Sequence, residues 1–593
     1  MYTSGTNEEL RRSDQILLPV SKPFIAKGKY DIYPGFKIND NQIFAGFEAL
    51  TERIKNYKNI SIDGYNGAFF DLFRARLGEL LIKDGRSVSW INTSRFFKAE
   101  DEIRSMISPF LGGDDPLFGQ KTTLNLEDFF IADRLISVKP DKDSDISILI
   151  GPGASLALWD GLLIYIDVPK NEIQFRSRAG SISNLGTSGA SDPKKMYKCS
   201  YFVDWVVLNK HKKRILPKID LFVDGQRPET PVWMDGTILR QSLFKMSRNV
   251  FRARPWFEPG AWGGTWIKNN IEGLNNDVPN YAWSFELITP ENGLLIESSA
   301  LLCEVSFDCL MYLQAGAVLG DCYAEYGTDF PIRFDFLDTF GGGNLSLQCH
   351  PRPQYMKENF GEKFAQEETY YILDTKDNAT VFLGFCDKIE PESFRHDLEE
   401  SYKHNKTFDP DKYILRHPVK KHDLLLIPYG TIHGSGKNNL VLEISTTPYI
   451  FTFKMYDWQR PDLDGKPRPL NIERGMKNLY FDRKGDFVTA SLISRPELLA
   501  EGSDWQLFRL PTHETHTYDV NRYHFQSSIE IPTNNKCLVM SLTEGKSIDV
   551  ETMNGFRTTF NFAETFVIPA EARSVRITNN SSSEAVLVKA FMK

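Results

Sequence analysis

Polar side chains alternate with apolar ones in Asn344-Leu-Ser-Leu-Gln-Cys-His-Pro351, in the middle of the 593-residue chain. Successive side chains of an extended strand point to opposite faces. Ser346, Gln348 and His350 therefore share one face, while leucines and a cysteine take the other. This pattern predicts one wall of a site for a metal or a polar ligand, with the proline ending the strand.

Two more candidate ligands follow at longer spacing. Glu368 lies at the start of the strand-like segment EETYYIL, and His433 follows IPYGTI at the inward turn of an expected hairpin. Two imidazoles, a carboxylate and an amide oxygen suit a borderline divalent cation such as zinc. The neutral Gln348 would leave that cation a stronger Lewis acid, able to polarise a carbonyl or hydroxyl group of a substrate.

A single histidine on a half-buried strand is more often an ordinary packed residue than a ligand. The order of the candidates favours a metal site: a Gln-x-His pair, then a glutamate, then a distant histidine after Pro-x-Gly-x-x-His. We therefore expect Gln348, His350, Glu368 and His433 to bind one divalent ion, most simply zinc.

The stretch from about residue 251 to 455, which carries these candidates, is expected to consist mainly of strands. Its turns are rich in glycine, proline and asparagine, and one helical insertion is expected at 391–403. The last hundred residues predict a second small barrel or sandwich. The strands expected there are 536–542, 547–550, 565–568, 574–578 and 585–590.

The first third of the chain has a different organisation, in which helical and strand-like segments alternate. Such alternation predicts a parallel α/β sheet. Helices are expected at 43–57 and 69–83, and strands at 60–62, 87–91, 145–150 and 162–168.

The glycine turn after the first of these strands resembles the start of the phosphate loop in uridine-kinase-like proteins. A working loop needs GxxxxGK[ST], whose backbone amides and lysine hold the phosphates. The turn here is GYNGAFFD, with Ala68 and Phe69 where the lysine and the hydroxyl residue belong. We expect a degenerate domain that does not hydrolyse ATP and acts as a scaffold.

Length and composition exclude several classes of protein. A chain of 593 residues allows about three to five domains. The net charge of −8, without an extended basic stripe, argues against nucleic acid as a partner. The seven cysteines are scattered and form no CxxC pair, which is typical of reduced thiols. Without an apolar leader or a run of about 18 apolar residues, we expect a cytoplasmic protein that has no membrane partner.

The run from about 251 to 480 resembles the type I mannose-6-phosphate isomerases of the cupin superfamily. The matching pieces are Trp262-Gly-Gly-Thr, Phe330-Pro-Ile to Phe336-Leu-Asp338, LSLQCHP, EETYYIL, IPYGTIHGSG, LEIS, and Tyr456-Asp-Trp-Gln-Arg460 through Asp464-Gly-Lys-Pro-Arg468. The resemblance implies a double-stranded β-helix (cupin) whose four candidate ligands hold the metal. It also implies a hexose phosphate substrate, with mannose 6-phosphate and fructose 6-phosphate interconverted through an enediol.

Together these patterns predict a multidomain α/β plus all-β protein. An N-terminal extension at 1–45 precedes a degenerate P-loop kinase-like α/β domain, a parallel sheet, at 46–245. A metal-binding cupin isomerase domain follows at 246–490, and a C-terminal cupin-like β-barrel at 491–593. The oligomeric state is left open.

Cations near the metal are the candidates for catalysis. Arg460 lies inside the matching YDWQR piece, and Lys454 precedes it. Each candidate has a structural alternative, since Arg460 can pair with Asp457 and Glu443 can be a packed acid near the ligands. The residues predicted to line the substrate are Ser346, Gln366 and Glu443.

Two positions depart from the pattern of the isomerases that the chain resembles. Gln366 stands where those enzymes usually have a lysine, and Lys454 where they usually have an arginine. A glutamine carries no charge, and a lysine lacks the two-pronged donor geometry of an arginine. Two alternatives therefore stay open: an isomerase of a non-phosphorylated sugar, or a non-catalytic, regulatory carbohydrate-binding cupin with a pseudo-kinase domain.

Overall fold

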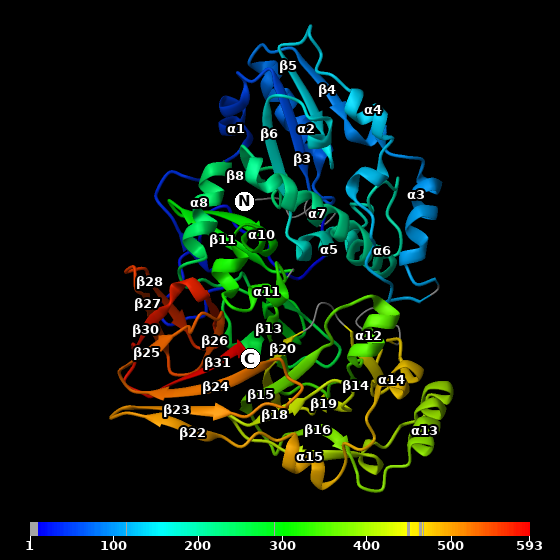
Figure 1. Ribbon diagram of the computed structural model, residues 1–593, viewed down its shortest axis with the longest axis vertical. Helices are drawn as coiled ribbons and strands as arrows, with labels where there is room; N and C mark the ends of the chain where they lie inside the picture. The colour runs from blue at the N-terminus through cyan, green and yellow to red at the C-terminus, as the bar shows by residue number, and fades with distance from the viewer. Residues whose placement is uncertain (1–9, 114, 290, 447–450, 462–464, 466–467) are drawn as a thin grey trace. The chain divides into compact units, whose positions relative to one another are not determined.

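The computed structural model describes residues 10–113, 115–289, 291–446, 451–461, 465 and 468–593. Contacts divide the chain into two compact units. Unit 1 comprises 1–24, 33–246 and 290–314, and unit 2 comprises 25–32, 247–289 and 315–593. Both can be followed along the chain in Figure 1.

Unit 1 is built on a sheet of seven strands. From edge to edge they are β2 (Phe44–Ala45), β8 (Val232–Asp235), β7 (Leu221–Asp224), β6 (Leu162–Asp167), β3 (Asn59–Gly64), β5 (Ile146–Ile150) and β4 (Val88–Asn92). The five strands from β7 to β4 pair in parallel, and β8 is antiparallel to β7. The predicted parallel α/β sheet is therefore confirmed, while its kinship with phosphate-loop kinases stays a prediction.

Helices supply the other half of the core of unit 1. Leu50 and Ile54 of α1 (Phe47–Ile54) and Leu77 and Leu81 of α2 (Phe70–Lys83) share one apolar cluster with the buried isoleucines, leucines and valines of the strands. Further helices of the unit are α3 (Glu100–Ile107), α4 (Ala132–Ser137), α5 (Lys170–Ala179), α6 (Pro193–Cys199), α7 (Trp205–Ile215) and α8 (Gly236–Met246). A separate sheet joins β1 (Gly35–Lys37), β11 (Gly293–Ser298) and β12 (Leu301–Ser306).

The turn between β3 and α2 is packed from within rather than left open for a phosphate. Arg176, which is fully buried, donates to the carbonyl of Gly67 at 2.7 Å and stacks at 4.1 Å on the ring of Phe69. A phosphate cradle presents backbone N–H groups to its ligand. This turn instead presents the carbonyl oxygen of Gly67, which already accepts a hydrogen bond from the Arg176 guanidinium.

Unit 2 contains two β-sandwiches. The sheets of the first are β18 (Leu424–Ile427), β15 (Glu367–Thr375), β20 (Asn439–Thr446), β13 (Ile332–Asp338), β10 (Trp283–Leu287) and β9 (Trp256–Glu258), and β17 (Ile414–Pro418), β16 (Thr380–Phe385), β19 (His433–Ser435), β14 (Leu347–Cys349) and β21 (Phe453–Tyr456). All their pairings are antiparallel. Two such facing sheets are the architecture that a double-stranded β-helix requires.

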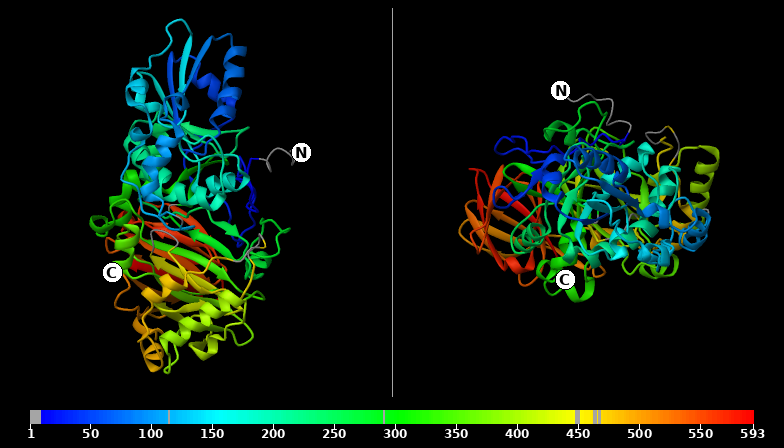
Figure 2. Two further views of the ribbon diagram at one scale, coloured as in Figure 1. Left: turned by 90° about the vertical axis from the view of Figure 1, so that its right-hand side faces the viewer. Right: turned by 90° about the horizontal axis from the view of Figure 1, so that it is seen from above.

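The second sandwich is formed by the C-terminal strands. Its sheets are β22 (Glu497–Glu501), β23 (Trp505–Leu510), β24 (Tyr518–Phe525), β31 (Ala585–Met592), β26 (Leu538–Glu544) and β29 (Thr565–Ile568), and β25 (Ser528–Pro532), β30 (Ser574–Asn579), β27 (Ser547–Thr552) and β28 (Arg557–Asn561). All five strands expected at 536–590 are present. The two sandwiches lie side by side, as the yellow and red strands show in Figure 2, and the Tyr518 hydroxyl donates to the carbonyl of Ile444 at 2.7 Å.

The expectation of one helical insertion between 251 and 455 is wrong. The insertion at α13 (Pro391–His404) is present, but α9 (Trp266–Asn270), α10 (Phe307–Leu319), α11 (Tyr323–Tyr326) and α12 (Pro353–Phe360) are helical as well. α10 is apolar nearly all round its surface, so the 3.6-residue periodicity that identifies a surface helix is missing. Further on, α14 (Ile472–Asn478) and α15 (Asp486–Ser491) follow. In the part of the chain that the structure describes, no helix has both the length and the apolarity to cross a membrane.

Candidate metal centre

Strand pairing in the first sandwich brings the predicted ligands together from both sheets. Gln348 of β14 lies directly opposite His433 of β19, so their side chains share a face. His350 is one residue past the end of β14, and Glu368 is the second residue of β15, in the other sheet. His433 is the first residue of β19 and not part of a turn, which corrects the expectation from the sequence.

The side chains converge on one carboxylate oxygen. Glu368 Oε2 lies 2.5 Å from His350 Nε2 and 3.8 Å from His433 Nε2. Ligand atoms of these three residues all lie within 4.8 Å of one another, and each residue is at most 1% exposed. Gln348 completes the group, with its amide nitrogen 3.4 Å from His433 Nε2.

Backbone carbonyls fix the tautomer of both histidines. His350 Nδ1 is 3.2 Å from the carbonyl oxygen of Phe451, and His433 Nδ1 is 3.0 Å from that of Thr431. Each Nδ1 therefore carries the proton and donates it, so each Nε2 presents a lone pair to Glu368. Burial, helped by His350, lowers the pKa of His433 to about 4 against the opposing effect of Glu368, so this ring is neutral at pH 7.

The donor atoms of this arrangement suit a divalent cation. Two imidazole lone pairs and a carboxylate face one another, and such a donor set is typical of zinc sites. The other oxygen of Glu368, Oε1, and the Tyr370 hydroxyl are buried without a hydrogen bond of good geometry. Turning the Gln348 amide by half a turn would present its oxygen to the same point. The residues present therefore fit a bound divalent ion.

A row of acidic side chains continues from Glu368 across the six-stranded sheet. Glu443 of β20 lies opposite both Tyr370 of β15 and Asp335 of β13, on the face that Glu368 also occupies two residues away. Burial and the charge of the neighbouring carboxylates raise the pKa of Asp335 and of Glu443 well above the usual range, against the opposing effect of Arg333. Each of these two carboxyl groups therefore holds its proton more tightly than an exposed carboxyl group does.

The predicted substrate-lining residues and Lys454 surround the ligands. Gln366 is buried and donates to Glu368 Oε2 at 3.2 Å, and the Ser346 hydroxyl donates to Gln348 Oε1 at 3.0 Å. Lys454 of β21 lies opposite Gln348, so its half-buried side chain leaves the strand on the ligand-bearing face.

Arg460 has a structural partner. Its guanidinium pairs with Asp457 at 3.0 Å, and Arg468 also pairs with that carboxylate. Among the described residues, both ion pairs lead to Asp457 and not to a candidate ligand, as the structural alternative expects. In the matching piece 464–468, residues 464, 466 and 467 lie outside the described residues.

Sequence reasoning missed Asp335, Arg333 and Tyr370 as members of the site. The signal was present, because Arg333 and Asp335 alternate with apolar residues in PIRFDFLD and so share one face of a strand. Which of the two faces points at the metal candidates depends on pairing with β20, which a single sequence does not reveal.

Comparison with known proteins gives a family-model match for one part of the chain and named relatives over part of its length. Residues 46–248 match a family model described as a domain of unknown function, DUF8485. The mannose-6-phosphate isomerase of Streptococcus mutans is 28% identical over 233 residues, which are 39% of this chain and 68% of that protein. Mannose-6-phosphate isomerase ManA of Bacillus subtilis is 22% identical over 259 residues, 40% of this chain and 74% of its own length.

Solved structures also align with part of the chain. The crystal structure of the mannose 6-phosphate isomerase from Bacillus subtilis aligns with a TM-score of 0.46 at 19% identity, covering 57% of this chain and 98% of the other. An H99A mutant of phosphomannose isomerase from Salmonella typhimurium aligns with a TM-score of 0.45 at 12% identity, covering 58% and 99%. This chain is thus similar to proteins named as isomerases over part of its length.

Proposed function

We propose that unit 2 is a metal-dependent aldose–ketose isomerase that converts mannose 6-phosphate and fructose 6-phosphate into each other through an enediol. Gln348, His350, Glu368 and His433 would hold one divalent ion, with zinc the best match to the donors. The observation that carries the proposal is the convergence of two imidazole lone pairs on the Glu368 carboxylate, with both Nδ1 protons held by backbone carbonyls. The similarity to enzymes named as mannose-6-phosphate isomerases supports the choice of reaction.

The reaction moves a proton between neighbouring carbons of the sugar. A bound cation there would stabilise the negative charge that develops on the substrate oxygens. The proton itself needs an acid–base group within hydrogen-bond reach. Asp335 and Glu443 suit this task, because they are paired across β13 and β20 and both have a raised pKa, which favours the protonated form. Glu443 is half-buried, which leaves it the more accessible of the two.

A sugar without a phosphate is a second candidate substrate. Asp335, Glu368 and Glu443 place carboxylates on one face of the sheet, and Gln366 adds no positive charge. A phosphate dianion close to that row would be repelled, with Lys454 as the cation on the opposite sheet to offset it. This row therefore favours mannose itself, or weak binding of its phosphate.

The test is an isomerase assay with the zinc-loaded protein on mannose 6-phosphate and on mannose. Glu443→Gln should lower kcat by roughly 100- to 10,000-fold, the range that acid–base groups contribute. Glu367→Gln is the control, because Glu367 is a buried glutamate next to Glu368 but on the opposite face of β15, where it accepts from the Thr517 amide at 2.7 Å. Equal activity of both variants would exclude the proton-transfer role.

The choice of substrate is tested at Gln366. Introducing a charge with Gln366→Lys should lower KM for mannose 6-phosphate by roughly 10- to 100-fold, the value of one charge-assisted hydrogen bond. KM for mannose should stay unchanged. Absence of turnover on both sugars, with no gain from this variant, would favour the non-catalytic carbohydrate-binding alternative.

Unit 1 would serve as a pseudo-kinase scaffold. Ala68 and Phe69 replace the residues that bind phosphate, and Arg176 fills the turn that would cradle it. Calorimetry with millimolar magnesium ATP should show no binding. Tight magnesium-dependent binding would overturn this role.

A further inference from the structure

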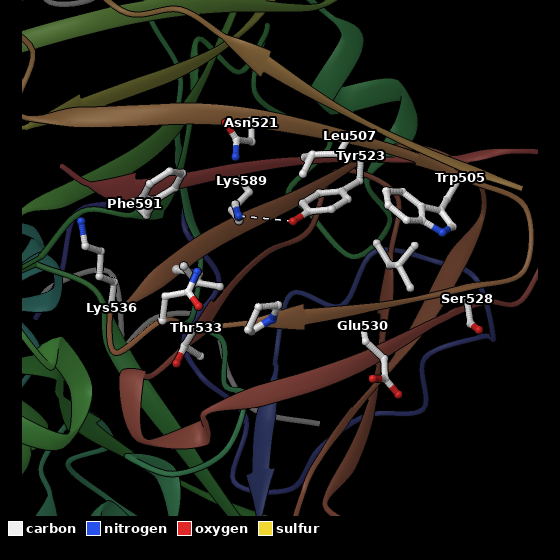
Figure 3. Close-up of a pocket in the computed structure, with 14 residues that line it drawn as sticks. Trp505, Leu507, Asn521, Tyr523, Ser528, Glu530, Thr533, Lys536, Lys589 and Phe591 are labelled. Atoms are coloured by element: carbon white, nitrogen blue, oxygen red, sulfur yellow. Dashed lines mark hydrogen bonds between the residues drawn. The ribbon is translucent and has the colours of Figure 1, made fainter. Parts of the chain in front are cut away.

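A cavity of about 630 Å³ lies in the C-terminal sandwich, away from the strands that carry the metal candidates. Its walls come from β23, β24, β25, β26 and β31, and Figure 3 shows the side chains that line it. The volume falls within the roughly 300–1,000 Å³ of small-molecule sites. Its lining combines three aromatic rings, two lysines and several hydroxyl and amide groups, so the cavity is neither a plain core void nor an apolar groove.

Lys589 is the unusual member of this lining. Its side chain projects into the cavity from β31, and the residue is only 8% exposed. Its ammonium group donates to the Tyr523 hydroxyl at 3.4 Å and lies 4.9 Å from the ring centre of Phe591. Among the described residues it has no carboxylate within ion-pair distance. Burial lowers the pKa of Lys589 to about 8, so the amine is still largely protonated at pH 7.

The carboxylate in the lining does not neutralise Lys589. Glu530 is exposed, and its carboxylate pairs with Arg576 on the neighbouring strand β30 at 2.7 Å. Lys536 adds a second positive charge to the wall; its ammonium group donates to the carbonyl of Met592 at 2.9 Å. The Tyr523 hydroxyl stays neutral, because burial raises its pKa to about 12. The interior is therefore positively charged, and a buried charge without a partner carries a large desolvation cost.

The remaining walls suit a ring with hydroxyl groups. Trp505 and Tyr523 lie along one side of the cavity in Figure 3, and Phe591 closes one end. Flat aromatic faces pack well against the C–H faces of a sugar ring. Asn521, which lies opposite Lys589 on β24, and Thr533 place an amide and a hydroxyl in the same lining. Such groups fix the orientation of a ligand by hydrogen bonds.

We propose that this cavity is a second ligand site, which binds a monosaccharide carrying an anionic group, phosphate or carboxylate, with that group paired to Lys589. The anion supplies the counter-ion that the lysine lacks, and the sugar ring packs between the aromatic side chains. The site is independent of the isomerase reaction, because its strands contribute none of the metal candidates.

Calorimetry on the full-length protein tests the proposal, in a Glu368→Gln background that removes sugar binding at the metal centre. The probes are mannose 6-phosphate, glucuronate, mannose and inorganic phosphate. At pH 7 we expect binding of at least one of the two sugar anions, at least tenfold tighter than that of mannose or of inorganic phosphate. Phosphate and carboxylate sources are distinguished by which of the two sugar anions binds more tightly.

Lys589→Met should weaken that binding by at least tenfold. This variant removes a buried charge and keeps the apolar stem, so the fold should survive, which circular dichroism can check. Lys546→Met is the matched control: Lys546 is an exposed lysine of the same sandwich, outside the cavity, and its loss should leave affinity unchanged. Binding should also weaken as pH rises above about 8, where Lys589 loses its proton.

Three results would overturn the proposal. One is no binding of either sugar anion, and another is an unchanged affinity in Lys589→Met. The third is equal affinity for inorganic phosphate and for both sugar anions, which would mean that the aromatic walls contribute nothing.

Discussion

Each unit contains a buried histidine–carboxylate cluster, and the two clusters hold their protons in opposite ways. In unit 1, Asp63 at the end of β3 accepts from the amides of Gly64 and Gly153 and from both the amide and the hydroxyl of Ser155, at 2.5–2.9 Å. His211 Nε2 is 2.9 Å from the same carboxylate. Arg214 donates to His211 Nδ1 at 3.1 Å, so the ring proton is on Nε2 and points at Asp63.

In unit 2 the protons point away from the carboxylate. His350 and His433 give their Nδ1 protons to backbone carbonyls, and their Nε2 lone pairs face Glu368. Five donors thus surround Asp63, whereas both histidines present lone pairs to Glu368, whose Oε2 accepts a hydrogen bond from the Gln366 amide. The same residue types thus form two different clusters. Asp63, Ser155 and His211 make a fully hydrogen-bonded structural cluster in unit 1, the closed cluster. His350, Glu368 and His433 make a candidate cation site in unit 2, the open cluster. The partner at Nδ1, not the presence of histidine and carboxylate, decides which one results.

The largest expected effect is the loss of the closed cluster. Asp63→Ala leaves five buried donors without an acceptor, so we expect it to destabilise unit 1 by about 3–5 kcal/mol. Urea denaturation followed by circular dichroism measures this. Asp71→Ala, at an exposed acid of α2, is the control and should change stability by less than about 0.5 kcal/mol. A small loss of stability in Asp63→Ala would show that these hydrogen bonds do not stabilise unit 1.

Zinc should stabilise the protein through the cluster of His350, Glu368 and His433. Zinc at 1,000 times its Kd should stabilise the wild-type protein by about 4 kcal/mol, because it binds only the folded chain. His350→Ala should abolish this gain. His211→Ala is the matched control from the closed cluster and should keep it, although it lowers the basal stability. Thermal denaturation with and without zinc gives both numbers. A zinc response that survives in His350→Ala contradicts the assignment.

A third buried carboxylate, Asp204, shows how the number of hydrogen-bond donors affects the pKa of a buried acid. Asp204 accepts from the Asn184 amide at 2.8 Å and the Leu185 backbone at 3.3 Å, and has no cationic partner among the described residues. Burial raises the pKa of Asp204 to about 7, whereas His211 and Ser155 outweigh burial at Asp63 and lower its pKa. Ionisation of Asp204 therefore lowers the stability of the folded protein.

The sign of the resulting pH dependence follows from that shift. The folded protein retains the Asp204 proton up to about pH 7, but the unfolded chain loses it near pH 4, so stability falls as pH rises through this window. Asp204→Asn should therefore stabilise the protein by roughly 2–4 kcal/mol at pH 8 and have no effect at pH 3. Urea denaturation at the two pH values is the measurement, and equal effects at both would refute the raised pKa.

The smallest effect concerns the hydroxyl of the closed cluster. Ser155, His211 and Asp63 have the residue types of a hydrolase triad. However, His211 Nε2 already carries a proton that points at Asp63, so this nitrogen cannot accept the proton of the serine hydroxyl. Ser155→Ala should cost about 1–2 kcal/mol of stability, the value of one buried hydrogen bond. It should leave the hydrolysis of p-nitrophenyl acetate at the background rate of the wild type. Serine-dependent hydrolysis would break the comparison.

The sequence alone identified what depends on local periodicity. Alternation placed Gln348 and His350 on one face, and the helix–strand alternation of the first third predicted the parallel sheet. It could not identify partners that come from pairing between distant strands. Asp335 and Glu443 become neighbours only when β13 pairs with β20, and the tautomers depend on carbonyls of Phe451 and Thr431, which carry no side-chain signal.

The central claim is that the open cluster binds one divalent ion, and the metal content of the protein tests it most directly. Full-length protein, loaded with zinc and dialysed, should contain one equivalent by plasma mass spectrometry. Zinc X-ray absorption should show nitrogen and oxygen ligands at about 2.0–2.2 Å with imidazole scattering. Glu368→Gln should lose the metal, and Asp63→Asn should keep it. Wild-type protein that holds no zinc, or a Glu368→Gln variant that retains a full equivalent, would contradict the account.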